Sequence, residues 1–183
     1  MFRAVRTLMF GGVAGKALGV VRELCTASLF GTGPIAVAYR LAQAAFLIPM
    51  NGLLSDALSA GFTPAYARGG LEHTARGRAV FAGMHAVVVA GSVLIAVALA
   101  LLAGTWVHVL APGFDESTAA LAERMVVVLA LAVPLYAAVS VYAAAGVAAG
   151  EPWLAAARAS WQNACVLGGT LLAWWLGEPM CIA

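Results

Sequence analysis

Three charged side chains inside an apolar segment near the N-terminus are the residues best suited to chemistry. Lys16, Arg22 and Glu23 all lie within residues 5–30, a segment otherwise apolar enough to cross a membrane. A charge at the centre of a membrane helix costs about 2.5–3.5 kcal/mol, so such residues usually face protein or a water-filled cavity. We therefore expect Lys16 and Arg22, together with Glu23, to line a polar cavity, where cations attract anions more strongly than they do in bulk water.

Each of these charged residues also has a simpler interpretation. The Lys16 side chain could extend to the membrane surface, although it lies ten residues after Arg6 and therefore deep in the segment. Arg22 and Glu23 could neutralise each other near the outer surface. For Arg40, near the start of the next apolar segment and therefore near its outer end, an extended side chain that reaches the interface is the favoured interpretation.

Glycines line one side of the first segment. Gly11, Gly15 and Gly19 recur every four residues, and Arg22 follows Gly15 by seven, so all four lie on one stripe of a helix. A stripe of small residues lets two membrane helices pack closely. It can also form the narrow wall of a cavity, and the two roles are compatible.

No residue pattern predicts an enzyme or a metal site. The sequence has no GxSxG motif, no phosphate-binding loop and no HExxH motif, and its serine, histidine and aspartate residues form no recognisable nucleophile arrangement. The cysteines, Cys25, Cys165 and Cys181, lack metal-ligand spacing. We therefore expect no catalytic residue, no metal and no cofactor.

The elements that position these residues follow from the composition. Of the 183 residues, 63% are hydrophobic and only 10% are charged, whereas soluble domains carry about 25% charged residues. Such a chain cannot cover the surface of a soluble globule, and disordered chains are rich in charge. The net charge of +2, without a basic run, does not favour nucleic-acid binding. The composition predicts a membrane protein.

Five apolar segments predict an all-α, polytopic membrane helix bundle that forms one domain over residues 1–183. The spans are expected at about 5–30, 35–61, 79–110, 125–150 and 159–177, each long enough for one crossing, which needs roughly 20 residues. The second span contains Arg40, Asp56 and Pro49. A cleaved signal peptide is the competing interpretation of the first span, but Lys16 interrupts its apolar run.

Arginines in the connecting loops predict the orientation. The first and third cytoplasmic segments would contain Arg6 and Arg158, and the second would contain the arginines of 68–78, whereas the loop at 111–119 has only Asp115 and Glu116. Since positive charge accumulates on the cytoplasmic side, the N-terminus is expected inside and the C-terminus outside.

Several stretches of the sequence resemble a known family. The run KALGVVRELCTASLFGTG, the later ALSAGFTPAYARG, APGFD, and the long segment from ERMVVV to ARASWQN are similar to the N-terminal part of the MviN/MurJ lipid II flippases. These transporters belong to the superfamily of multidrug, oligosaccharidyl-lipid and polysaccharide exporters. The resemblance covers roughly residues 5–177, in the family's order and spacing.

The resemblance implies a transporter of the bacterial inner membrane that moves an undecaprenyl-pyrophosphate-linked sugar, a peptidoglycan precursor, to the outer leaflet. In the family, cationic residues of the first helix face the pyrophosphate of the substrate. Lys16 and Arg22 stand where the family has cavity arginines, and Glu23 stands where it has an aspartate. These three residues are therefore the candidate substrate-binding residues.

The chain also departs from the family pattern. Val37 replaces an acidic residue, and Met50 with Asn51 replaces an arginine pair. These changes make an exporter of exopolysaccharide or capsule repeat units the alternative. Family members have many more helices, in two lobes, so we expect part of a first lobe, a truncated product. Such a product would depend on the missing lobe or on self-association, or would be a remnant that transports nothing.

Overall fold

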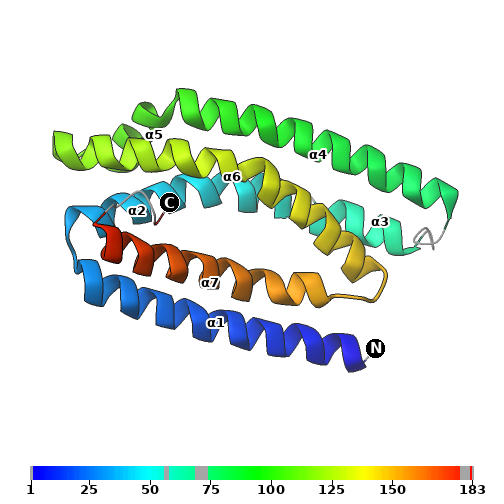
Figure 1. Cartoon of the computed structure of the whole chain (residues 1–183). Coiled ribbons are helices and arrows are strands. Elements are labelled where there is room, and N and C mark those ends of the chain that lie inside the picture. Colours follow the sequence, from blue (N-terminus) through cyan, green and yellow to red (C-terminus); the bar gives the residue numbers. More distant parts are fainter. Residues whose placement is uncertain (1, 56–57, 69–73, 178–181, 183) are drawn as a thin grey trace.

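The computed structural model describes residues 2–55, 58–68, 74–177 and 182, and all of its secondary structure is helical (Figure 1). Seven α-helices are described, with two short π-helical segments. The α-helices are α1 (Phe2–Phe30), α2 (Pro34–Pro49), α3 (Thr63–Arg68), α4 (Ala75–Leu101), α5 (Ala103–Leu110), α6 (Glu116–Ala148) and α7 (Trp153–Leu176), and the π-helical segments are η1 (Met50–Ser55) and η2 (Leu58–Phe62). The prediction of an all-α fold is confirmed for the described part of the chain.

Two of the expected spans are interrupted. The α-helical part of the segment 35–61 ends at Pro49, because proline lacks the N–H that would continue the ladder and its ring crowds the preceding turn. The chain continues there as η1 and η2, and Asp56 lies outside the described residues. The segment 79–110 breaks at Leu102, and the new direction lets Ala103 and Val107 of α5 pack into the core.

Helix α6 provides the surface on which the other helices of the bundle pack. Apolar clusters follow one another along it, from Met125 through Val133 to Val141. Their partners come from α2, α4, α5 and, near the end of α6, from η2 and α3. The α2 face that contacts α6 is built from alanines with helical spacing, among them Ala38, Ala42 and Ala45.

The loop before α6 ends in an acidic cap. The Asp115 carboxylate accepts hydrogen bonds from the Ser117 hydroxyl and from the hydroxyl and backbone N–H of Thr118. These bonds to the ionised form hold the pKa of the Asp115 carboxyl well below its usual range. A carboxylate at this position also satisfies an N–H group that the helix itself leaves unpaired.

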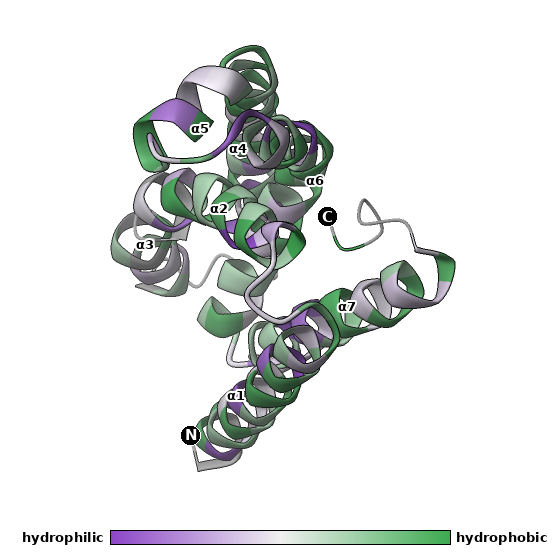
Figure 2. Cartoon of the chain, turned by 90° about the vertical axis from the view of Figure 1, so that its left-hand side faces the viewer, coloured by the Kyte–Doolittle hydropathy of each residue, from purple (hydrophilic) through white to green (hydrophobic). Residues whose placement is uncertain are grey.

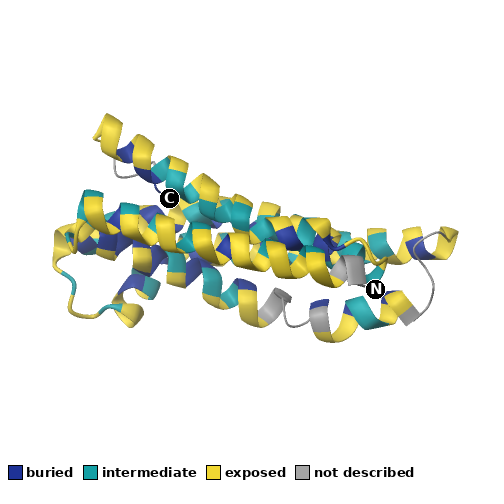
Figure 3. Cartoon of the chain, turned by 90° about the horizontal axis from the view of Figure 1, so that it is seen from below, coloured by how far each residue is buried: buried dark blue, intermediate teal, exposed yellow. Residues whose placement is uncertain are grey.

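The helices form two layers that diverge from each other (Figure 2). One layer is the bundle of α2 to α6. The other is the pair of α1 and α7, which run in the same direction side by side (Figure 1). Buried residues are confined to the lines where helices meet, and much of the remaining surface is exposed and apolar (Figure 3). Among the described helices, α4 and α6 are long and apolar enough to cross a membrane.

Candidate anion-binding site

The glycine stripe of α1 lies against α7. A Cβ atom on Gly11 would lie 2.5 Å from the backbone oxygen of Ala156, and one on Gly15 would lie 2.8 Å from the Cβ of Ala159. Both distances are shorter than real Cβ contacts. The absence of side chains at these glycines therefore permits the close approach of the two backbones, the packing role expected of a small-residue stripe.

Asn163 of α7 connects the glycine contact to the charged residues. Its Nδ2 donates to the backbone oxygen of Gly15 over 2.9 Å, and its Oδ1 accepts from Nη1 of Arg22 over 3.0 Å. Gly19 lies beside the same side chain, since a Cβ there would be 3.4 Å from Nδ2 of Asn163. The stripe thus leaves space for an amide that holds the arginine in place.

Arg22 and Glu23 form an ion pair that reaches a second helix. Nη2 of Arg22 lies 2.5 Å from Oε1 of Glu23, and the other carboxylate oxygen, Oε2, accepts from Nη2 of Arg40 on α2 over 3.2 Å. The Arg22 side chain is 14% exposed, against 47% for Glu23 and 59% for Arg40. Arg22 and Glu23 therefore neutralise each other, as the simpler interpretation of the sequence suggested. Arg40 does not extend by itself to the interface but pairs with the same carboxylate.

Lys16 lies two helical turns before this ion-pair cluster on α1. Its side chain is exposed and, within the described part of the chain, makes no hydrogen bond or ion pair. It precedes Glu23 by seven residues, so the two share one face of α1, and the bond between Glu23 and Arg40 shows that this face is turned towards α2. The structure thus brings Arg22 and Arg40 together with one carboxylate, which leaves an excess of positive charge. Lys16 lies on the same face of α1, about 10 Å before Glu23 along the helix.

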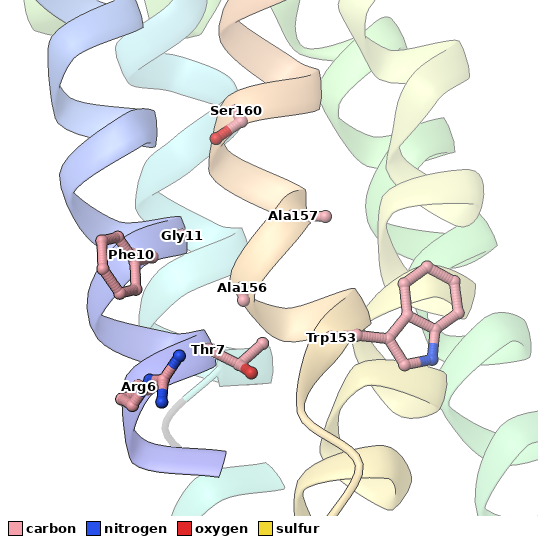
Figure 4. A pocket seen from close by; sticks show the side chains of 8 residues that line it. All are labelled: Arg6, Thr7, Phe10, Gly11, Trp153, Ala156, Ala157 and Ser160. Atoms are coloured by element: carbon pink, nitrogen blue, oxygen red, sulfur yellow. The ribbon is translucent and has the colours of Figure 1, made fainter. Parts of the chain in front are cut away.

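A separate groove opens where α1 and α7 begin. It has a volume of about 860 Å³, with Arg6, Phe10 and Trp153 around small residues of both helices (Figure 4). The three candidate substrate-binding residues do not line it. The Trp153 ring is directed away from α1 (Figure 4), towards the side of α7 that faces the bundle.

Reasoning from the sequence missed two residues that bond to the Arg22–Glu23 pair, namely Asn163 and Arg40. Asn163 had one usable signal, since it is one of few strongly polar residues in the segment 159–177 and such amides often bond across membrane helices. Arg40 had none, because a single cation near a helix end fits an interfacial position equally well. Among the described residues, no group of histidine, cysteine or acidic side chains could hold a metal ion.

Comparison with known proteins finds no relative of this chain. No protein family, no curated protein and no solved structure matches the chain.

Proposed function

We propose that the chain is a multi-pass protein of the bacterial inner membrane that binds an undecaprenyl-pyrophosphate-linked sugar, as part of a lipid II flippase. The observation that carries this proposal is the pairing of Arg22 and Arg40 with the single carboxylate of Glu23, with Lys16 two turns earlier on the same face of α1. A diphosphate carries several negative charges, and an excess of cations among apolar helices is the arrangement that would attract it.

The position of Arg22 supports a binding role. Asn163 and Glu23 hold its guanidinium in one place, so little side-chain entropy remains to be lost when an anion binds. Lys16 has no such partner among the described residues and is free to turn towards a ligand. The resemblance to the MviN/MurJ flippases supplies the substrate class.

A membrane location is supported by the exposed apolar surface. Large side chains such as Phe10, Leu94 and Leu131 are each at least 71% exposed. Soluble monomers rarely expose apolar patches of this extent. We place five crossings in the bilayer, with the N-terminus and Arg76 in the cytoplasm and Glu116 outside, as the positive-inside rule suggests. Reporter fusions at Arg76 and Glu116 test this orientation; a periplasmic reporter that is active at Arg76 would refute it.

A second candidate is an exporter of exopolysaccharide or capsule repeat units. It is favoured by the residues at the end of α2, where Met50 is buried and Asn51 is exposed in place of the family's arginine pair. Without that pair, fewer groups remain to recognise the sugar and peptide portions of lipid II. Both candidates share the pyrophosphate and the polyprenyl chain, so they differ only in the head group that is bound.

Binding to the protein in lipid nanodiscs tests the proposal. We expect lipid II to bind more tightly than undecaprenol, which lacks the diphosphate, and Lys16→Ala to weaken binding about fivefold to tenfold through the loss of one partly desolvated charge. Arg78→Ala removes an exposed cation of α4 outside the cluster and is the matched control. Equal binding of lipid II and undecaprenol would refute the proposal and favour a protein that transports nothing.

The identity of the head group decides between the two candidates. Tighter binding of lipid II than of an undecaprenyl-pyrophosphate-linked glycan without the peptide would favour a peptidoglycan precursor. The reverse order would favour the exopolysaccharide substrate.

A further inference from the structure

Arg158 has surroundings unlike those of Arg22. It follows the start of α7 by five residues, within the helix rather than in the loop where the sequence analysis placed it. Its Nη1 donates to Oγ of Ser140 over 3.0 Å, and its guanidinium carbon lies 5.2 Å from the centre of the Tyr136 ring. Ser140 donates its own proton to the backbone oxygen of Tyr136, so it is an acceptor for Arg158.

Both partners of Arg158 are neutral. A guanidinium has five N–H groups, and only one of them donates a hydrogen bond to a partner in the described part of the chain. The ion pairs described there join Glu23 to Arg22 and Arg40, and none of them involves Arg158. A partly buried cation without a carboxylate is costly unless an anion reaches it from outside.

Arg158 lines an apolar groove between α6 and α7, five residues after Trp153, where the α7 side of the groove begins. The groove has a volume of about 630 Å³. Trp153 and Trp161 of α7, Leu135 and Val139 of α6 and Phe46 of α2 are among the residues that line it. It continues along α7 to Val166, eight residues beyond Arg158, or about 12 Å of helix. The groove therefore has the polarity of an amphiphile, with one cationic site at Arg158 and an apolar channel that runs beyond it to Val166.

We propose that this groove binds an anionic phospholipid of the cytoplasmic leaflet, with the phosphate at Arg158 and one acyl chain between α6 and α7. The inference rests on the membrane location and orientation proposed above, but not on the transported substrate. Arg158 lies roughly 8 Å from the start of α7, a depth at which a lipid phosphate is expected near a helix that begins at the inner surface. The tryptophans on either side suit this interfacial level. Electrostatic complementarity thus favours an anionic lipid over a zwitterionic one.

Lipid preference of the purified full chain tests the proposal. Phosphatidylglycerol and phosphatidylcholine with identical acyl chains are added in turn to the protein in detergent, and bound lipid is counted by native mass spectrometry. We expect the wild-type chain to prefer phosphatidylglycerol about fivefold, the effect of one interfacial cation. The variant Arg158→Gln should bind both lipids equally, whereas Arg158→Lys should retain part of the preference.

Two further variants separate the site from general effects. Arg78→Gln removes an exposed cation of α4 and should leave the preference unchanged. Val139→Trp should fill the apolar channel and weaken binding of both lipids while Arg158 remains. Circular dichroism checks that each variant keeps its helices. An unchanged preference in Arg158→Gln, or none in the wild type, would overturn the proposal. Because no lipid-linked sugar is present, either result is independent of the test for substrate binding.

Discussion

Where α1 meets α7, the contact includes glycine, alanine and one asparagine, whereas in the bundle α6 contributes larger apolar side chains, such as Met125 and Val133. Gly11 and Gly15 bring the two backbones together, and Asn163 adds hydrogen bonds to Gly15 and Arg22. In the bundle, Met125 and Val133 are fully buried among side chains of three other helices. The α1–α7 contact thus depends on the small volume of its residues and on hydrogen bonds, whereas the bundle depends on the close packing of larger apolar side chains.

This difference determines how each region responds to substitution. In the α1–α7 pair, added volume is the harmful change, because a backbone oxygen cannot move aside as a flexible side chain can. In the bundle, removed volume is harmful, because neighbouring helices do not collapse into the space left behind. Substitutions that add volume should therefore destabilise the α1–α7 pair, and substitutions that remove volume should destabilise the bundle.

The largest effect is expected from added volume at the glycine stripe. Gly11→Val should lower the free energy of unfolding by about 3 kcal/mol, because its Cβ would overlap the backbone oxygen and Cβ of Ala156. Gly12→Val is the matched control, since nothing lies within 4 Å of a Cβ at Gly12. Unfolding by SDS in mixed micelles, followed by circular dichroism, measures both. Equal losses for the two variants would contradict the close contact of α1 with α7.

Removal of volume in the bundle should have the next largest effect. Met125→Ala should cost about 2 kcal/mol, the lower end for buried methionine, because packing rather than transfer from water dominates between membrane helices. Leu131→Ala, on the same helix but 75% exposed, should change stability little. The same unfolding assay applies. A larger loss of stability for Leu131→Ala than for Met125→Ala would contradict the packing of the Met125 face of α6 against the bundle.

Loss of the polar bridge tests the other half of the α1–α7 contact. Asn163→Ala should cost about 1 kcal/mol, a common value for hydrogen bonds between membrane helices. It should also free Arg22, so lipid II affinity should fall even after the variant is shown to be folded. Gln162→Ala, a neighbouring amide, is the control, for which no bond to α1 is described. If neither the stability nor the lipid II affinity changed, Asn163 would have no role in the site.

The smallest effect is expected at the exposed edge of the cluster. Arg40→Gln removes an ion pair whose partners are both about half exposed, and such pairs contribute about 0.5 kcal/mol. Since salt screens exposed charges, the loss should shrink as the ionic strength of the assay rises. An unfolding series from low to high salt measures this. A loss of several kcal/mol that salt does not reduce would show that Arg40 is part of the core.

Much of the fold was predictable from local features of the sequence. The apolar segments at 5–30 and 159–177 correspond to α1 and α7, since an apolar run of membrane-spanning length without an internal proline favours one continuous helix. The segment 79–110 was correct in extent but not in continuity, because no proline marks the break at Leu102 and the nearby Gly104 lies inside α5. Pro49 did mark the end of α2, although the π-helical continuation had no sequence signal.

The sequence by itself determined the helical class, the apolar surface and the glycine stripe with Arg22 at its end, because composition and spacing along one helix are local properties. Only the tertiary structure decided which residues meet across helices. Asn163 bonds to Arg22 from 141 positions away, and Arg158 faces Ser140 instead of a carboxylate. Such pairings depend on the rotation and crossing of whole helices, which arise from the packing of every residue in the contact and not from the periodicity of either helix alone.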